Sequence, residues 1–297
     1  MSIQTNSSSQ VADSLIERTM NGPINAPITV VQPSKGLFHI DVPGIWHYRE
    51  LLYFLVWRGI KTRYTQTVLG VGWAIIQPLM MMAIFTVVFS MFAQIPSDGL
   101  PYPIFAYAAL LPWTYFSEAI RRGSVSVIND ANLVQKIYFP RLMLPLSGVL
   151  TPLVDVVPAL GILLGMMVWY GLTPSWSVVA LPAFLALALL TALSVSLWLS
   201  ALNVQYRDVQ NTVPFIVQLW LYASPVVYPV SLVPEGWRLL YSLNPMVGVI
   251  EGFRWALLGK DSPDYAVMAV SASMVLLLLM GGLVYFTRME RTFADVI

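Results

Sequence analysis

The stretch VVALPAFLALALLTALSVSLWLSAL, from Val178 to Leu202, decides the fold class because it contains no Asp, Glu, Lys or Arg. A helix needs about 20 such apolar residues to cross the hydrocarbon core of a bilayer. Five more windows have the same character, with one acid in the third: Trp73–Ala93, Gly99–Ser117, Leu142–Tyr170, Asn211–Tyr228 and Ala266–Thr287. The sequence therefore predicts an all-α membrane protein with six transmembrane helices.

The composition agrees with this prediction. The chain has 297 residues, of which 57% are hydrophobic and only 10% are charged, with a mean hydropathy of +0.70. Soluble domains carry about 25% charged residues, so a water-soluble fold is excluded. A formal net charge of +1, without a long basic run, gives no indication of nucleic-acid binding. No cysteine and only two histidines leave little material for a metal site, and none is predicted.

The placement of the basic residues predicts the orientation. Most of the sixteen Lys and Arg residues fall on the side of the two termini, whereas Arg238, Arg254 and Lys260 fall on the opposite side. Cytoplasmic segments are enriched in Lys and Arg. Both termini are therefore expected in the cytoplasm, in a multi-pass protein of the cytoplasmic membrane.

The chain before the first span divides into two regions. Residues 1–36 lack an apolar run and are expected to form a disordered cytoplasmic tail. Residues 37–72 are expected to hold an amphipathic interface helix, because Ile45–Tyr64 mixes aromatic and basic side chains. This helix is either a plain membrane anchor or an entrance where cations meet the phosphate of an anionic lipid-linked substrate. The candidate cations are Arg58, Lys61 and Arg63. Residues 73–297 form the predicted transmembrane domain.

The loop between the second and third spans contains a candidate docking element. Asn129 or Asp130 can cap a short helix there, and apolar residues follow at helical spacing. Such a helix either fits a groove on a soluble partner or packs against its own bundle. Its candidate contact residues are Asn129, Asp130, Asn132, Leu133, Val134, Lys136 and Ile137. Arg207 and Asp208, in the next loop on the same side, can pair with each other, touch a partner or be solvated.

Between the fifth and sixth spans, the segment Ser231–Tyr265 is too polar to cross a bilayer and too apolar for an external loop. It predicts a re-entrant pair of short helices, broken at Asn244-Pro245 and ended by Gly259. Glu251 and Arg254 are three residues apart and can pair on the second helix.

Aromatic residues recur in the predicted spans, and most should belong to interface belts or to helix packing. A minority facing a pore would offer flat surfaces on which sugar rings can slide. The candidates are Trp113, Tyr115, Phe116, Tyr222 and Tyr228.

Catalytic motifs are absent from the sequence. It contains no GxxxxGK[ST], no HExxH and no convincing GxSxG, so neither ATP hydrolysis nor another enzymatic activity is predicted. Asp155 is the one ionisable residue in the apolar core of a predicted span. A helix-packing role, protonated or hydrogen-bonded, is favoured over proton coupling, because a proton relay needs a chain of such groups.

Dispersed motifs resemble one family of membrane proteins. They are LLYFLVWRGIKTRYTQTVLGVGWAIIQPL (51–79), NDANLVQKIYFPRLMLPL (129–146), NVQYRDVQNTVPFIVQLWLYASPVVYP (203–229), NPMVGVIEGFRWALLG (244–259) and FADVI (293–297). Together they are similar to the ABC-2 type permeases that export polysaccharides such as O-antigen, capsule and teichoic acid. Departures are small: Gly59 stands where the family often has an acid, and Gln135 where a lysine is common.

The resemblance implies a homodimer that works with two copies of a separate ABC ATPase, which binds the ATP and Mg. No cofactor is then expected in this chain itself. Residues 129–137 would be the coupling helix, with Arg207 and Asp208 nearby, and the cargo would be a lipid-linked polysaccharide. Asn244, Pro245, Glu251 and Arg254 would belong to an external gate.

Three rival functions remain from sequence alone. An ABC-2 exporter of a drug or lipid shares the topology but should have an apolar cavity. A membrane transferase acting on lipid-linked sugars would need clustered acids at the interface, and Asp41, Glu50 and Asp208 are scattered. An ion-coupled transporter is disfavoured by the isolation of Asp155.

Overall fold

The structure, a computed structural model, describes residues 42–65, 72–259 and 264–293, and within these ranges it contains no strand. The predicted tail at residues 1–36 lies outside them. The helical elements follow in chain order: α2 (Val42–His47), α3 (Arg49–Tyr64), α4 (Gly72–Phe85), the π-helix η1 (Thr86–Phe92), α5 (Tyr102–Asn129), α6 (Ala131–Lys136), α7 (Met143–Leu150), α8 (Leu153–Trp169), the 3-10 helix η2 (Trp176–Ala180), α9 (Leu181–Gln205), α10 (Val209–Tyr222), the 3-10 helix η3 (Val230–Leu232), α11 (Glu235–Tyr241), α12 (Pro245–Leu258) and α13 (Tyr265–Glu290).

Four helical stretches in the described part of the chain are long and apolar enough to cross a membrane. They are Gly72–Phe92, Met143–Trp169, Trp176–Gln205 and Tyr265–Glu290. They match the predicted first, third, fourth and sixth spans, so the protein is a multi-pass membrane protein. The predicted second span lies in α5, which is long but carries Glu118, Arg121 and Arg122. The predicted fifth lies in α10, whose 14 residues reach about 21 Å at 1.5 Å per residue. The count of six remains a prediction.

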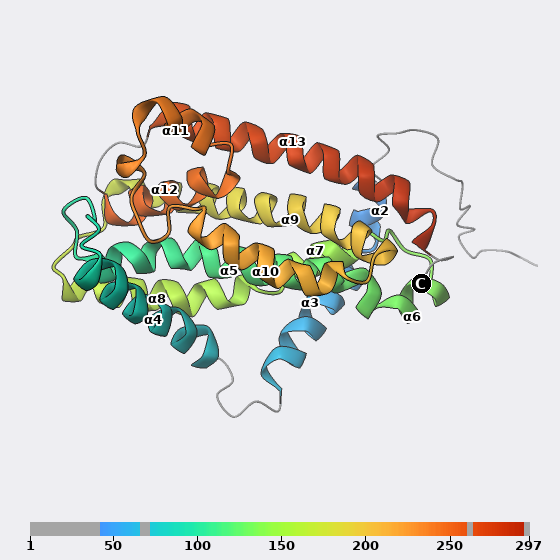
Figure 1. The fold of residues 1–297 in the computed structure, drawn as a ribbon. Helices are drawn as coiled ribbons and strands as arrows, with labels where there is room; N and C mark the ends of the chain where they lie inside the picture. The colour runs from blue at the N-terminus through green and yellow to red at the C-terminus, as the bar shows by residue number, and fades with distance from the viewer. Residues whose placement is uncertain (1–41, 66–71, 260–263, 294–297) are drawn as a thin grey trace, which may run out of the picture. The chain divides into compact units, whose positions relative to one another are not determined.

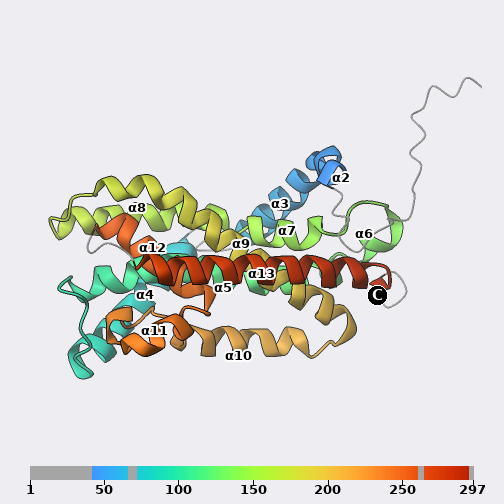
Figure 2. The ribbon, with the colours of Figure 1, turned by 90° about the horizontal axis from the view of Figure 1, so that it is seen from above.

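Helix α5 forms the core of the described chain. Most of its residues are buried, and it contacts α4, α7, α8, α9, α10 and α12. Figures 1 and 2 show α5 running beside α9, which in turn lies beside α13. Small residues permit this close packing, because a Cβ on Gly123 would collide with Ser196 on α9. A Cβ on Gly148 of α7 would lie 3.0 Å from the backbone of Gly123. The three helices therefore meet almost backbone to backbone.

The interface helix is interrupted in the structure. Tyr48 separates α2 from α3, with φ −92° and ψ 20°. One side of α3 packs on α7, and Leu55 is its one buried residue. A Cβ on Gly59 would lie 2.7 Å from Thr151 Oγ1, so a carboxylate side chain at this position would have to displace its neighbour. Glycine at this position therefore lets α3 approach Thr151 closely.

The opposite side of α3 is exposed and carries the side chains Tyr53, Phe54, Trp57, Arg58 and Lys61. Helix α3 therefore has a packed side and an exposed side, and the exposed side mixes aromatic and basic groups. An exposed mixture of this kind is typical of a helix at headgroup depth.

The segment between α10 and α13 has the predicted local structure. It forms α11 and α12, separated near Asn244, and Gly259 ends α12 with φ 65°. The Asn244 side chain accepts a hydrogen bond from Met246 N at 3.1 Å, which caps the start of α12. Proline at the first position of α12 suits a helix start because it lacks an N–H that would be unsatisfied there. Most of α12 is buried, and it packs on α5, α9 and α13.

Candidate functional site

Arg58 on α3 and Asp130, at the start of α6, form an ion pair. Arg58 Nη2 donates hydrogen bonds to both carboxylate oxygens of Asp130, at 2.6 and 2.7 Å. The Asp130 side chain makes no capping bond to α6, because it is directed to Arg58 instead. The structure thus joins a residue predicted to meet substrate phosphate to one predicted to meet a partner protein. Sequence reasoning treated them as separate sites, and no spacing rule connects positions so far apart in the chain.

Helix α6 occupies the position predicted for the docking element. Val134 is buried within the chain and Leu133 is partly buried, and both belong to an apolar cluster that includes residues of α3, α9 and α13. Ile137 is 55% exposed, and Asn132 and Lys136 are exposed too. Helix α6 packs one side on its own bundle, as one of the two interpretations predicted, and exposes its other side. Binding of a partner to that exposed side stays a prediction.

The loop between α9 and α10 exposes both of its predicted residues, Arg207 and Asp208. They form no ion pair with each other, one of the alternatives left open by the sequence. The Asp208 backbone carbonyl accepts a hydrogen bond from the Thr212 hydroxyl at 2.9 Å.

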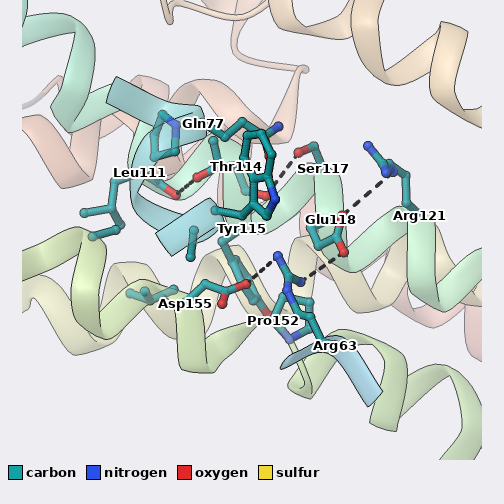
Figure 3. Close-up of a pocket in the computed structure, with 15 residues that line it drawn as sticks. Arg63, Gln77, Leu111, Thr114, Tyr115, Ser117, Glu118, Arg121, Pro152 and Asp155 are labelled. Carbon is teal, nitrogen blue, oxygen red and sulfur yellow. Dashed lines mark hydrogen bonds and ion pairs between the residues drawn. The ribbon is translucent and has the colours of Figure 1, made fainter. Parts of the chain in front are cut away.

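Arg63, at the end of α3, is held between two acids. Its Nη1 lies 3.0 Å from Glu118 Oε1 on α5, and its Nη2 lies 2.8 Å from Asp155 Oδ2 on α8. The Tyr64 hydroxyl donates to the other oxygen of Asp155. Figure 3 shows Arg63 pointing between Glu118 and Asp155. The cluster ties three helices together, and it gives Asp155 the hydrogen-bonded packing role that its lone position in the sequence favoured.

The environment of this cluster changes the pKa of the Tyr64 hydroxyl. Burial, followed by the hydrogen bond to Asp155 and the charge of that carboxylate, raises the pKa of the Tyr64 hydroxyl to about 12. The nearby guanidinium groups of Arg63 and Arg122 act in the opposite direction but are weaker. Tyr64 therefore stays a neutral hydrogen-bond donor to Asp155 at physiological pH.

Glu118 forms ion pairs with two arginines on its own helix besides Arg63, a close one with Arg122 and a distant one with Arg121. Arg122 Nε lies 2.7 Å from Glu118 Oε1, and Arg121 Nε lies 3.8 Å from Oε2. Sequence reasoning missed Glu118, although its spacing of three and four residues from these arginines was a visible signal. The pairing also explains how α5 keeps an acid and two bases next to an apolar core.

A hollow lies beside this cluster, between α3, α4, α5 and α8. It has about 540 Å³ of empty space, part of which is open to solvent. Figure 3 shows its wall, in which Thr114 and Ser117 lie between Gln77 and Arg121 in this view. Trp73, at the start of α4, is 54% exposed and also lines it. The hollow is thus polar, with an aromatic ring at its edge.

The predicted channel aromatics fall into two groups. Trp113, Tyr115 and Phe116 on α5 are buried within the chain. The Tyr115 hydroxyl donates to Val149 O at 3.2 Å, so these side chains have partners inside the bundle and would reach a sugar only if the helices separated. Tyr222 is 50% exposed, and the hydroxyls of Tyr228 and Tyr241 lie 2.9 Å apart. Tyr222 is thus the exposed candidate, and Tyr228 is partly buried.

The predicted pair on α12 is present. Arg254 Nη1 lies 3.0 Å from Glu251 Oε1, and Arg254 Nη2 donates to Val226 O at 3.0 Å. The guanidinium also lies over the Phe105 ring, 3.6 Å from its centre. A buried guanidinium needs such compensation. These contacts fix α12 against α5 and against the chain after α10, while the role of the segment in a gate stays a prediction.

No group of three or more His, Cys, Asp or Glu residues within the described ranges is arranged to hold a metal ion.

Comparison with known proteins places the chain among transporters. The sequence profile of the ABC-2 type transporter family matches residues 50–258. The O-antigen export system permease protein RfbA of Myxococcus xanthus is 33% identical over 261 residues, covering 86% of this chain and 98% of its own length. A protein with the same name from Klebsiella pneumoniae is 27% identical over 251 residues, 84% of this chain and 95% of its own. The polysialic acid transport protein KpsM of Escherichia coli is 26% identical over 239 residues, 78% of this chain and 91% of its own.

Proposed function

The chain belongs to the ABC-2 type transporter family, and from this premise we propose that it is the transmembrane subunit of an ATP-driven exporter of a lipid-linked polysaccharide. The cargo is an O-antigen-like polymer, as the names of the relatives from Myxococcus xanthus and Klebsiella pneumoniae suggest. The ATP and Mg are bound by a separate ATPase subunit, because this sequence has no P-loop.

The observation that carries the proposal is the Arg58–Asp130 ion pair. It joins α3, whose exposed side mixes aromatic and basic groups, to α6, whose exposed side is free for a partner. An ATP-driven exporter must link ATP hydrolysis by its partner to the movement of its substrate. A bond between the element that faces the substrate and the element that faces the partner can provide this link.

The ATPase is proposed to bind the surface that α6 and the loop before α10 expose. Asn132, Lys136 and Ile137 supply the α6 part, and Arg207 and Asp208 supply the loop part. An exposed isoleucine ringed by polar groups resembles the centre of a small protein interface. Two copies of this chain and two ATPase copies make the complete exporter, with the polymer passing along the seam between the two copies.

The orientation follows from the same surface. If α6 meets a cytoplasmic ATPase, the ends of the helices near α6 are cytoplasmic, and α11 and α12 lie toward the outer leaflet of the cytoplasmic membrane. In this arrangement α5 and α10 complete a set of six crossings, and α11 with α12 forms a re-entrant external gate. Lys61, on the exposed side of α3, lies at headgroup depth, where a lipid phosphate is within its reach.

The test is reconstitution of the full-length chain in lipid nanodiscs, with the ATPase encoded beside it. ATP hydrolysis is measured with and without the lipid-linked polysaccharide of the source cell. We expect hydrolysis to rise when that glycolipid is added and to stay at its basal rate with the same lipid lacking sugar. Stimulation by a small apolar lipid or drug instead would overturn the polysaccharide assignment.

A capsule-type polymer is the second candidate, because the relatives from Escherichia coli are named for polysialic acid transport. The same assay separates the two candidates, with the two glycolipids added in turn. The relative identities of 33% and 26% favour the O-antigen-like cargo.

A further inference from the structure

The cations predicted to meet the substrate phosphate are mostly engaged within the chain. Arg58 is bound to both oxygens of Asp130, and Arg63 is held between Glu118 and Asp155. A phosphate would have to displace a carboxylate from either residue. A phosphate would bind more readily to a basic group that has no such close partner.

Arg121 is such a group. Its Nε lies 3.8 Å from Glu118 Oε2, beyond hydrogen-bond distance, and its side chain is 56% exposed. Arg122, the next residue, is 31% exposed and bonded at 2.7 Å to the same carboxylate. Within the described part of the chain, the Arg121 guanidinium has no hydrogen-bond acceptor.

The cluster contains one more basic group than acidic groups. Three guanidinium groups, those of Arg63, Arg121 and Arg122, share the two carboxylates of Glu118 and Asp155. Because Arg63 and Arg122 take the short contacts, the excess charge falls on Arg121. A planar guanidinium with free donors at the rim of a partly enclosed hollow is suited to a phosphate group.

The rest of the hollow is suited to a sugar. Trp73 and Gln77 are four residues apart on α4 and therefore lie on the same side of the helix, and both line the hollow. The Gln77 side chain has no hydrogen-bond partner among the described residues, and Thr114 and Ser117 place hydroxyls between it and Arg121 (Figure 3). An exposed indole beside amide and hydroxyl groups offers a flat apolar face together with donors and acceptors.

We propose that this hollow binds the glycosyl-phosphate head of the lipid-linked cargo, with the phosphate on Arg121 and the first sugar ring against Trp73 and Gln77. The inference rests on the proposed function and names the part of the cargo that the chain recognises. It assigns the phosphate to α5, whereas the interface helix supplies Arg63 as a structural partner. Glu118 attracts the Arg121 guanidinium but forms no hydrogen bond with it. The guanidinium therefore keeps its donors for a phosphate.

Binding of three probes to the full-length chain in nanodiscs tests this assignment. The probes are a polyprenyl phosphate carrying one hexose, the same lipid without hexose, and a neutral polyprenyl hexoside. R121Q is expected to weaken binding of both phosphate lipids about tenfold, the loss of one charge-assisted contact, and to leave the neutral hexoside unchanged. R49Q removes the same charge from an exposed position at the start of α3, outside the cluster, and serves as the matched control, with a smaller effect.

Two further variants complete the design. R121K keeps the charge and should restore most of the phosphate affinity, while W73L should reduce the preference for the hexose-bearing lipid about fivefold through loss of the ring contact. Equal effects of R121Q and R49Q would overturn the inference, because they would show a general charge effect instead of a contact. A wild-type chain that binds all three probes equally would overturn the proposed function as well.

Discussion

Arg58 and Asp130 lie 72 positions apart in the sequence, yet Arg58 Nη2 contacts both carboxylate oxygens of Asp130 at 2.6 and 2.7 Å. The pair connects α3 with the residue that precedes α6. The Arg58 side chain is 45% exposed, and surface pairs of this kind contribute at most about 1 kcal/mol to stability. Its importance is therefore expected in communication between the two helices and not in folding.

Breaking this pair should uncouple ATP hydrolysis from the recognition and movement of the polysaccharide. R58A and D130A are each expected to leave the melting temperature within about 2 °C of wild type, since little stability is lost. Each should reduce the stimulation of ATP hydrolysis by glycolipid several-fold. The charge-exchanged double variant R58D/D130R should recover part of that stimulation, and a double variant as weak as the single ones would contradict a direct connection.

The exposed side of α6 should be required for ATPase binding. I137D introduces a charge at a 55% exposed position, so the chain is expected to fold normally and to lose the ATPase on co-purification. V134D is the contrasting variant. Val134 is 5% exposed, and a charge there should unfold the local packing and lower the yield of the protein in the membrane. Co-purification of the ATPase with I137D in normal amount would remove α6 from the docking surface.

Asp155 should act in packing and not in proton movement. D155N weakens the bond to Arg63 and is expected to lower the free energy of unfolding by about 2 kcal/mol, the range for a hydrogen bond between charged groups. Export measured with and without a proton gradient should be equally fast in the wild-type protein. A dependence on the gradient that D155N abolishes would support proton coupling instead.

The close approach of α5, α7 and α9 should tolerate no larger side chain. G123V places a branched side chain where a Cβ already collides with Ser196, and G148V meets the backbone of Gly123. Each is expected to destabilise the protein by about 1–3 kcal/mol through overpacking. G161V on α8 is the matched control, because a Cβ there meets nothing within 4 Å. Equal melting temperatures for G123V and G161V would contradict the packing described.

The sequence was sufficient for features that depend on local pattern. Apolar windows with at most one charged residue located four of the predicted spans. Asn244-Pro245 and Gly259 located the break between α11 and α12 and the end of α12, because capping and a positive φ are local properties. The Glu251–Arg254 pair followed from helical spacing in the same way.

Contacts between distant segments could not be predicted from the sequence. The partners of Arg58 and Arg63 come from α5, α8 and the start of α6, and no periodicity connects them. The burial of Trp113 and Phe116 could not be predicted either. In the sequence, the aromatic residues of a span look alike whether they face lipid, protein or a channel. Only the packing of α5 against its neighbouring helices separates these cases.

The most direct test of the central claim is transport by the reconstituted chain with and without its ATPase. Vesicles containing both proteins are supplied with the lipid-linked polysaccharide, and the polymer that reaches the opposite side is measured while ATP is present, absent or replaced by a non-hydrolysable analogue. We predict transport only when both proteins and hydrolysable ATP are present. Transport by this chain alone, with no nucleotide hydrolysed, would contradict the account.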